Sequence, residues 1–384
     1  MLIVELRNFG PVEKLLFWSG QLVEGLEFRP GIALIYGKHG CGKTLLALAL
    51  HVLPLEVVRR IDESSSVRKA VTGYIDVLNN FIDIEDLVAN SIAGFCRPGI
   101  EVEELESIGW SPSHIKWACV RFFKGDVKLH LVSVDGKVVL SENVKELGSR
   151  GRNAIESILA QSLAVISVPF NLLAKLYTLS YSEFKHLQNA FSELDSCSEP
   201  LCEILRLRTI PIVVDYEGIT ESTHKGLGRL GVVFKGYRGV ESIKIFMKKS
   251  LGEVKEEIMD TVKELLNLMK SQLKEYRATP TVLIDDMFDG FTSREVVADV
   301  LKRLKSIVNT FNASVYTTTH RSVAALVKED TGIESKILVA SYGLQKTSQR
   351  LGVQTDFRLV LADTEAIEGI GKDLKDEIGG EFIG

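Results

Sequence analysis

Two adjacent acids at the end of an apolar run are the first residues whose types and spacing could do chemistry. The segment VLIDDMFDGF, residues 282–291, is apolar as far as Ile284 and then turns acidic at Asp285 and Asp286. Paired carboxylates at a strand end can hold a divalent cation and position a water molecule. A strand that simply runs out into a polar turn has the same pattern. The acids therefore indicate a reaction only if a phosphate site exists elsewhere in the chain.

Such a site is indicated by GIALIYGKHGCGKTLLALAL, residues 31–50, where a glycine-rich loop separates an apolar strand-like run from a helical run. Gly37, Gly42, Lys43 and Thr44 fill the phosphate-binding P-loop pattern G-x-x-x-x-G-K-[ST]. Glycines let the backbone wrap closely around an anion, and the loop amides and helix N-terminus direct positive charge at phosphates. The sequence therefore predicts a nucleotide site, with ATP and Mg²⁺ as cofactors.

Roles follow for individual residues of this site. Lys43 is expected near the β and γ phosphates, Thr44 on Mg²⁺, and Asp285 on the metal side of the same site. Asp286 is placed to polarise an attacking water. His39 and Cys41 occupy variable positions of the loop, so only backbone contacts are expected of them. The full set of expected nucleotide contacts in this segment is Gly37, Lys38, His39, Gly40, Cys41, Gly42, Lys43, Thr44 and Leu45.

The remaining pattern predicts an α/β protein with a mixed central sheet, an antiparallel β patch and a helical lobe. We divide it into residues 1–145, with the P-loop and the β patch, and residues 146–384, with the helical lobe and the acidic strand. Strands are expected at 2–7, 13–18, 31–36, 114–123, 126–134, 137–140, 163–169, 210–216, 314–319, 336–340 and 357–362. Helices are expected from residue 45, over 66–92, within 152–207, and over 251–277 and 293–311, with a loop-rich region at 217–240. The 251–277 helix carries one apolar stripe, which fits a buried surface helix better than a coiled coil.

Bulk properties set limits on the class of protein. The chain has 384 residues and a formal net charge of −5, which does not advertise a strongly basic nucleic-acid binder, although a local basic face remains compatible with it. Neither a signal peptide nor an apolar run of about 18 residues is seen, so a soluble cytoplasmic protein is expected, with no membrane partner. The five cysteines form no CxxC pair, which disfavours a zinc site, and Cys197 and Cys202 are expected to be reduced.

The order of these motifs resembles the ABC-type ATPases of the SMC/RecF-like branch, which includes many AAA-type ATP-binding proteins. LRNFGPVEK (6–14) resembles the family's opening strand and turn, and GKHGCGKT resembles its Walker A loop. LIDDMFDGF (283–291) resembles Walker B with the following D-loop. TTTHRS (317–322) resembles the switch strand, so that His320 is expected to contact the γ-phosphate and sense hydrolysis.

The sequence departs from the family pattern at several points. The signature segment is degenerate: KSLGE (249–253) offers Ser250 and Gly252, and LSYSE (179–183) is a second candidate. Gln161 is the candidate Q-loop glutamine. Asp286 stands where the family usually has a glutamate, which is one methylene longer, so either the water approaches closer or hydrolysis is slow.

The resemblance implies an ATPase that forms a homodimer around Mg-ATP in DNA repair, genome maintenance or defence. DNA and a nuclease or another protein are then candidate partners, although the basic spots at 148–153 and 301–305 fit a solvated surface equally well. Two alternatives stay open: a regulatory or scaffold protein that binds ATP with little hydrolysis, and the nucleotide-binding subunit of an ABC transporter. A fused Toprim nuclease is disfavoured because too few residues follow His320.

Overall fold

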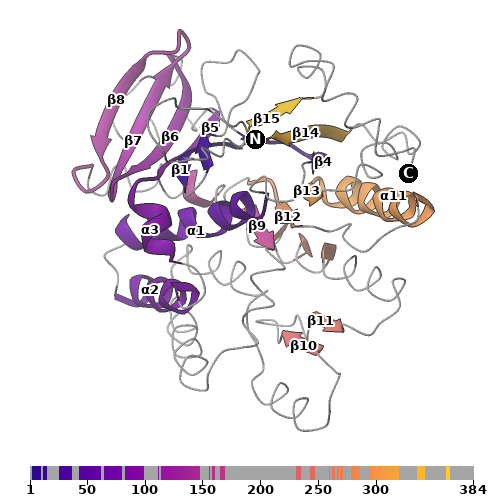
Figure 1. Ribbon diagram of the computed structural model, residues 1–384. Helices are drawn as coiled ribbons and strands as arrows, with labels where there is room; N and C mark the ends of the chain where they lie inside the picture. The colour runs from indigo at the N-terminus through magenta and orange to yellow at the C-terminus, as the bar shows by residue number, and fades with distance from the viewer. Residues whose placement is uncertain are drawn as a thin grey trace, which may run out of the picture.

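The computed structural model describes two large β-sheets, a small two-stranded sheet and several helices (Figure 1). The described residues are 2–9, 12–14, 26–36, 43–61, 65–79, 83–98, 114–147, 165–168, 231–234, 243–246, 278–285, 294–319, 335–341 and 360–363, together with single positions at 111, 155, 158–160 and between 259 and 273. Every structural statement below concerns these residues.

The first sheet is antiparallel and is built mainly from the N-terminal part of the chain. Its strands run in the order β2-β1-β5-β6-β7-β8, with β3 paired to β1. One face is apolar and forms a core through residues such as Leu6, Phe95 and Phe122, each at most 1% exposed. The strands are β1 (Leu2–Phe9), β2 (Val12–Lys14), β3 (Leu26–Phe28), β5 (Ile92–Pro98), β6 (Ile115–Phe123), β7 (Asp126–Ser133) and β8 (Val138–Asn143).

The second sheet is the central one, and it is parallel except at one edge. Its order is β15-β14-β4-β13-β12-β9, and only β15 runs antiparallel to its neighbour. Residues 32–35 and 281–284 are buried without interruption, as expected where a parallel sheet is covered on both faces. The strands are β4 (Gly31–Tyr36), β9 (Val165–Val168), β12 (Thr281–Ile284), β13 (Ser314–Thr319), β14 (Ser335–Ser341) and β15 (Val360–Asp363).

Helix α1 (Lys43–Ile61) joins the two sheets. It packs against β9 and β13 of the central sheet, and also against β7 of the antiparallel sheet. Residues 46–58 are all buried, so the helix has no solvent face over most of its length. It also continues through Pro54. Helix α11 (Arg294–Phe311) is amphipathic and packs against β4 and β13.

The predicted helix over 66–92 is interrupted. Helix α2 (Ser65–Asn79) is followed by the short helix α3 (Ile84–Ala89) and then by β5, a strand that the sequence analysis missed. Side-chain caps cause the break. The Asp86 amide donates to Asp83 Oδ1 at 2.9 Å, and the Ile84 amide donates to Asn79 Oδ1 at 3.0 Å. Both bonds satisfy backbone donors that a continuous helix would have used internally.

Two further expectations are corrected in the second half of the chain. Part of the region 217–240, predicted as loop, is strand β10 (Gly231–Phe234), which pairs antiparallel with β11 (Ile243–Phe246). Within the predicted 251–277 helix, the apolar stripe was expected at positions 251, 254, 258, 262, 265, 269, 273 and 276. The described buried positions include Met259 and Leu266, which are not in that set. The whole buried set is Met259, Val262, Leu266, Met269 and Leu273, still spaced by three and four residues. The predicted strand at 210–216 lies outside the described residues.

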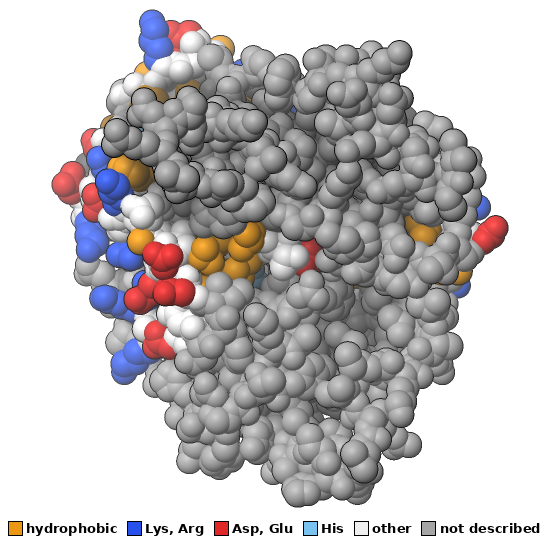
Figure 2. All heavy atoms as spheres, viewed as in Figure 1, with side chains coloured by type: hydrophobic (Ala, Val, Ile, Leu, Met, Phe, Trp, Pro, Cys, Tyr) orange, Lys and Arg blue, Asp and Glu red, His pale blue; other side chains and the backbone are white. Residues whose placement is uncertain are grey.

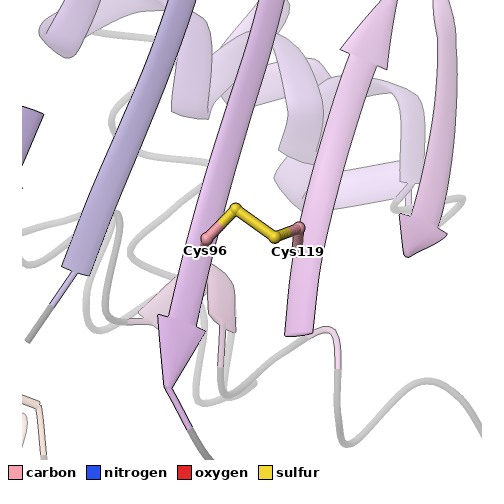
Figure 3. Close-up of a disulfide and its surroundings, with 2 residues drawn as sticks. All are labelled: Cys96 and Cys119. Atoms are coloured by element: carbon pink, nitrogen blue, oxygen red, sulfur yellow. A yellow bond between two sulfur atoms is a disulfide. The ribbon is translucent and has the colours of Figure 1, made fainter. Parts of the chain in front are cut away.

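A disulfide joins Cys96 on β5 to Cys119 on β6, at directly paired positions of neighbouring strands (Figure 3). The two Cα atoms are 4.0 Å apart, and both side chains are buried beside Trp117 and Val132. The sequence analysis did not predict this bridge. Cys197 and Cys202 lie outside the described residues, so their reduced state stays a prediction.

We expect the disulfide to contribute about 3 kcal/mol to stability, because it closes a loop of 23 residues in the unfolded chain. Reduction with dithiothreitol should lower the free energy of unfolding by that amount in urea titrations followed by circular dichroism. The double variant Cys96→Ala and Cys119→Ala is the matched control, because it should show the lower stability at once and no further response to reductant. Equal stability of the oxidised and reduced wild-type protein would contradict this expectation.

His130 on β7 lies opposite Cys119 on the same face of the antiparallel sheet. Its pKa is lowered from 6.5 to about 4, mainly by burial and to a smaller extent by the nearby charges of Arg121 and Lys128. The folded protein therefore holds this imidazole neutral under conditions in which the unfolded chain binds a proton.

Stability should consequently fall as the pH drops from 6.5 to about 4, because the unfolded chain binds more protons than the folded protein in that window. Protonation of His130 does not reduce the free energy of unfolding above pH 6.5, and its destabilising effect is complete below about pH 4. Since the side chain is only partly buried, we expect a loss on the order of 1 kcal/mol from this residue. His130→Gln should flatten the pH dependence of the free energy of unfolding in this window. An unchanged slope in that variant would exclude His130 as its source.

Candidate nucleotide-binding site

The register of the central sheet brings three chain segments to the same edge. Thr318 on β13 pairs with Ile35 on β4, and Thr317 pairs with Ile284 on β12. Because these strands are parallel, the residues that follow each of them emerge at a common carboxyl edge. These are the glycine-rich loop after β4, Asp285 after β12, and the residues after β13. The two predicted halves of the site, more than 240 residues apart in the chain, thus follow strands β4 and β12, which are separated only by β13.

The helix that follows the glycine-rich loop begins at Lys43, the lysine of the phosphate-binding pattern. Lys43 is 5% exposed, whereas Thr44 and Leu45 are half-buried. A buried ammonium group needs negative or hydrogen-bonding partners to offset its desolvation. The first amides of α1 have no acceptor within the helix and carry the positive end of its dipole. This end of α1 is therefore suited to an anion.

Asp285 is fully buried at the end of β12. The hydroxyl of Thr318, on the neighbouring strand β13, donates to Asp285 Oδ1 at 2.6 Å, and Thr318 is itself fully buried. This charge-assisted bond fixes the direction of the carboxylate. Burial of an ionised carboxylate is costly unless hydrogen bonds and positive charge compensate it. Asp285 is thus a buried carboxylate with a fixed orientation at a strand end, and not a residue of a solvated turn.

Thr318 is a positioning residue that the sequence analysis missed. It was noted only as part of a strand that precedes His320. Its role depends on β13 lying beside β12 with Thr317 level with Ile284, which places the next residue of each strand together. A run of three threonines in an otherwise apolar strand was the one sequence signal for a polar contact there.

The residues present fit Mg²⁺. The Thr44 hydroxyl and the Asp285 carboxylate are oxygen ligands of the kind that Mg²⁺ prefers. No group of three or more His, Cys, Asp or Glu side chains that could hold a metal is found among the described residues.

The other predicted site residues lie outside the described part of the chain, and their roles stay predictions. They are Gly37, Lys38, His39, Gly40, Cys41 and Gly42 of the loop, Gln161, Ser250 and Gly252 of the candidate signature, Asp286 and His320.

Comparison with known proteins gives a fold-level likeness alone. No protein-family model matches the sequence, and no curated protein matches it either. Among solved structures, the chain is similar to an SMC head domain from Thermotoga maritima at 9% sequence identity and a TM-score of 0.31. The match covers 88% of this chain and 94% of that one.

Among the described residues, no helix is both long and apolar enough to cross a membrane.

Removal of the Thr318 hydroxyl should destabilise the protein through Asp285. Thr318→Val keeps the side-chain shape but leaves the buried carboxylate without this donor, so we expect a loss of about 1.5–3 kcal/mol in the free energy of unfolding. Thr318→Ser keeps the hydroxyl and removes a methyl group, which should cost about 1 kcal/mol. Urea unfolding of the three proteins at pH 7 measures both values. A valine variant as stable as the serine variant would show that the bond to Asp285 contributes nothing.

Proposed function

We propose that the protein binds Mg-ATP at the carboxyl edge of the central sheet and hydrolyses it. The observation that carries the proposal is the buried Asp285 at the end of β12, held by Thr318 from the adjacent strand β13. One strand further along, β4 leads into the glycine-rich loop, and α1 begins at the motif lysine. A buried, oriented carboxylate beside a phosphate-binding pattern is the arrangement that Mg-nucleotide chemistry requires.

Each residue then has a role in this chemistry. The Lys43 ammonium neutralises the terminal phosphates, and the free amides at the start of α1 bind phosphate oxygens. Thr44 and Asp285 would hold Mg²⁺, which supplies charge neutralisation at the phosphates when bound. Asp286 would orient the attacking water, and His320 would contact the γ-phosphate. The last two roles rest on the sequence pattern.

We further propose that the active form is a homodimer with ATP at its interface. In that assembly the Ser250–Gly252 segment of one subunit completes the phosphate site of the other. The two lobes, residues 1–145 and 146–384, would form one ATPase head. DNA repair, genome maintenance or defence is the process that the sequence resemblance favours, with DNA or a nuclease as a partner.

A regulatory protein that binds ATP with little hydrolysis is the second candidate function. Asp286 favours it, because a side chain one methylene shorter than glutamate holds the water-orienting carboxylate further from the phosphate. The first function requires turnover, whereas the second requires binding alone.

The test compares ATP binding, ATP turnover and molecular mass in one set of variants. Lys43→Ala should weaken ATP binding at least tenfold, because the fixed cation at the terminal phosphates is lost. Lys302→Ala, which removes an exposed lysine on α11, is the matched control and should bind as the wild type does. Asp286→Asn should bind ATP, stop turnover and accumulate as a dimer in light scattering with ATP and Mg²⁺.

The outcomes separate the candidate functions. Wild-type affinity in a folded Lys43→Ala protein, judged by its circular dichroism melt, would remove the nucleotide site. Binding without turnover in the wild type would favour the regulatory function. A single unchanged mass with and without ATP, in both the wild type and Asp286→Asn, would remove the homodimer.

A further inference from the structure

A second site lies at the opposite end of α1 from the phosphate-binding pattern. A cavity of about 450 Å³, partly open to solvent, is lined there by the last turn of α1, by α2, by the β6–β7 turn and by the residues after β8. Helix α1 has 19 residues, so the two ends are separated by about 27 Å along its axis. The cavity thus has no part in the nucleotide site.

Basic side chains from three different elements converge on this cavity. Arg59 and Arg60 come from α1, Arg68 comes from α2, and Lys145 follows β8. The lining contains one acid, Asp126, and within the described part of the chain it forms no ion pair with these groups. The lining therefore carries an excess of positive charge.

Ion pairs with a carboxylate of the protein neutralise only part of this positive charge. Arg59 donates to the buried Glu56 at 2.9 Å, and Arg60 Nε lies 3.6 Å from the same carboxylate. One carboxylate thus serves two guanidinium groups. Arg68 and Lys145 are exposed, and among the described residues neither side chain has an ion-pair partner. The uncompensated charge is what an anionic ligand would meet.

The position of Arg60 is fixed by its surroundings. Its guanidinium lies over the ring of Phe122, 5.6 Å from the centroid. The β6–β7 turn is a two-residue turn in which Lys124 and Gly125 have φ of 47° and 84°, the pattern of a type I′ hairpin. A Cβ at Gly125 would lie 3.1 Å from Arg60 Nη1, so the glycine gives this guanidinium its room. The Arg60 guanidinium is therefore held in a defined position at the cavity wall.

An alternative explanation is that Arg59 and Arg60 serve only to interact favourably with the helix dipole at the C-terminus of α1. That reading explains two residues of the same turn, but it does not explain the convergence of Arg68 and Lys145 from other elements. Along the edge of the molecule where α2, α3 and the outer strands of the antiparallel sheet lie, Lys and Arg side chains are interspersed with Asp and Glu side chains (Figure 2), so the excess of positive charge is particular to the cavity lining. Repulsion among the four basic side chains of the cavity lining destabilises the protein, and a bound anion would offset this cost.

We propose that this cavity binds a small phosphoryl-bearing molecule. Guanidinium forks match phosphate geometry in a bidentate manner, and the Thr72 hydroxyl and Asn143 amide supply polar groups at the same wall. The volume lies within the range typical of small-molecule sites. A nucleic acid fits less well. The adjoining cavity shares Arg59 and Arg60 and adds two acids, Glu56 and Glu85, against one further cation, Lys124, so the basic surface does not continue as a track.

The test uses inorganic pyrophosphate as the probe, titrated by calorimetry into the full-length protein without Mg²⁺. Arg68→Glu combined with Lys145→Glu should weaken the binding at least tenfold, because both side chains are exposed and the changes reverse the charge at the cavity. Lys302→Glu on α11 is the matched control for one such charge reversal and should bind as the wild type does. Melting temperatures confirm that all three proteins are folded.

The remaining outcomes decide the proposal. Pyrophosphate binding of unchanged strength in the double variant would assign it to another site and overturn the proposal. Short duplex DNA that binds the wild type, fails to bind the double variant and displaces pyrophosphate would overturn the small-ligand assignment in favour of a nucleic acid. ATP affinity in the double variant should equal that of the wild type. Failure of the nucleotide site would leave this result unaffected, since the variants change only the distant cavity.

Discussion

The burial of α1 on all sides is the constraint on which the rest of the structure depends. A helix that is apolar all round cannot face solvent, so other elements must cover each of its faces. The central sheet covers it through β9 and β13, and the antiparallel sheet covers it through β7. The helix continues through Pro54, at a cost of about 3 kcal/mol, because Leu55, Val57 and Val58 beyond it are buried. Burial of each contributes about 1.5–3 kcal/mol, so together they outweigh the proline.

A second constraint operates at the carboxyl edge of the central sheet. Parallel pairing of β4, β13 and β12 brings their carboxyl ends to the same edge of the sheet, so a polar group placed after one strand can meet groups of the next. Asp285 can be buried there because Thr318 arrives in register from β13. The same register that builds a continuous apolar core thereby orients a carboxylate. The sheet and the candidate site are consequences of one pairing pattern.

The sequence predicts well those elements whose pattern is local. β4, β13 and α11 agree with their predicted bounds to within a residue, because each is an apolar run or an amphipathic stripe with clear breaks. β5 was missed because its sequence, IAGFCRP, contains Gly94 and Pro98, residues typical of turns. Its strand conformation comes from pairing with β1 and β6 on both sides.

The contacts that matter chemically were less accessible to sequence reasoning. Asp285 was identified because the phosphate-binding pattern demanded a carboxylate, but Thr318 required knowledge of which strand lies beside it. The Cys96–Cys119 bridge depends on a register between strands, and the basic cavity depends on three elements meeting at one point. Spacing along the chain carries no signal for either.

The two ends of α1 raise the question of whether the sites influence each other. Groups separated by about 27 Å on a helix interact weakly through solvent, and mutational effects at such distances are normally additive. Coupling would require an element with two discrete arrangements that both ligands bias. A helix enclosed on every side is a poor candidate, because a shift would break its packing against both sheets at once. The burial of α1 is thus expected to keep the two proposed sites energetically separate.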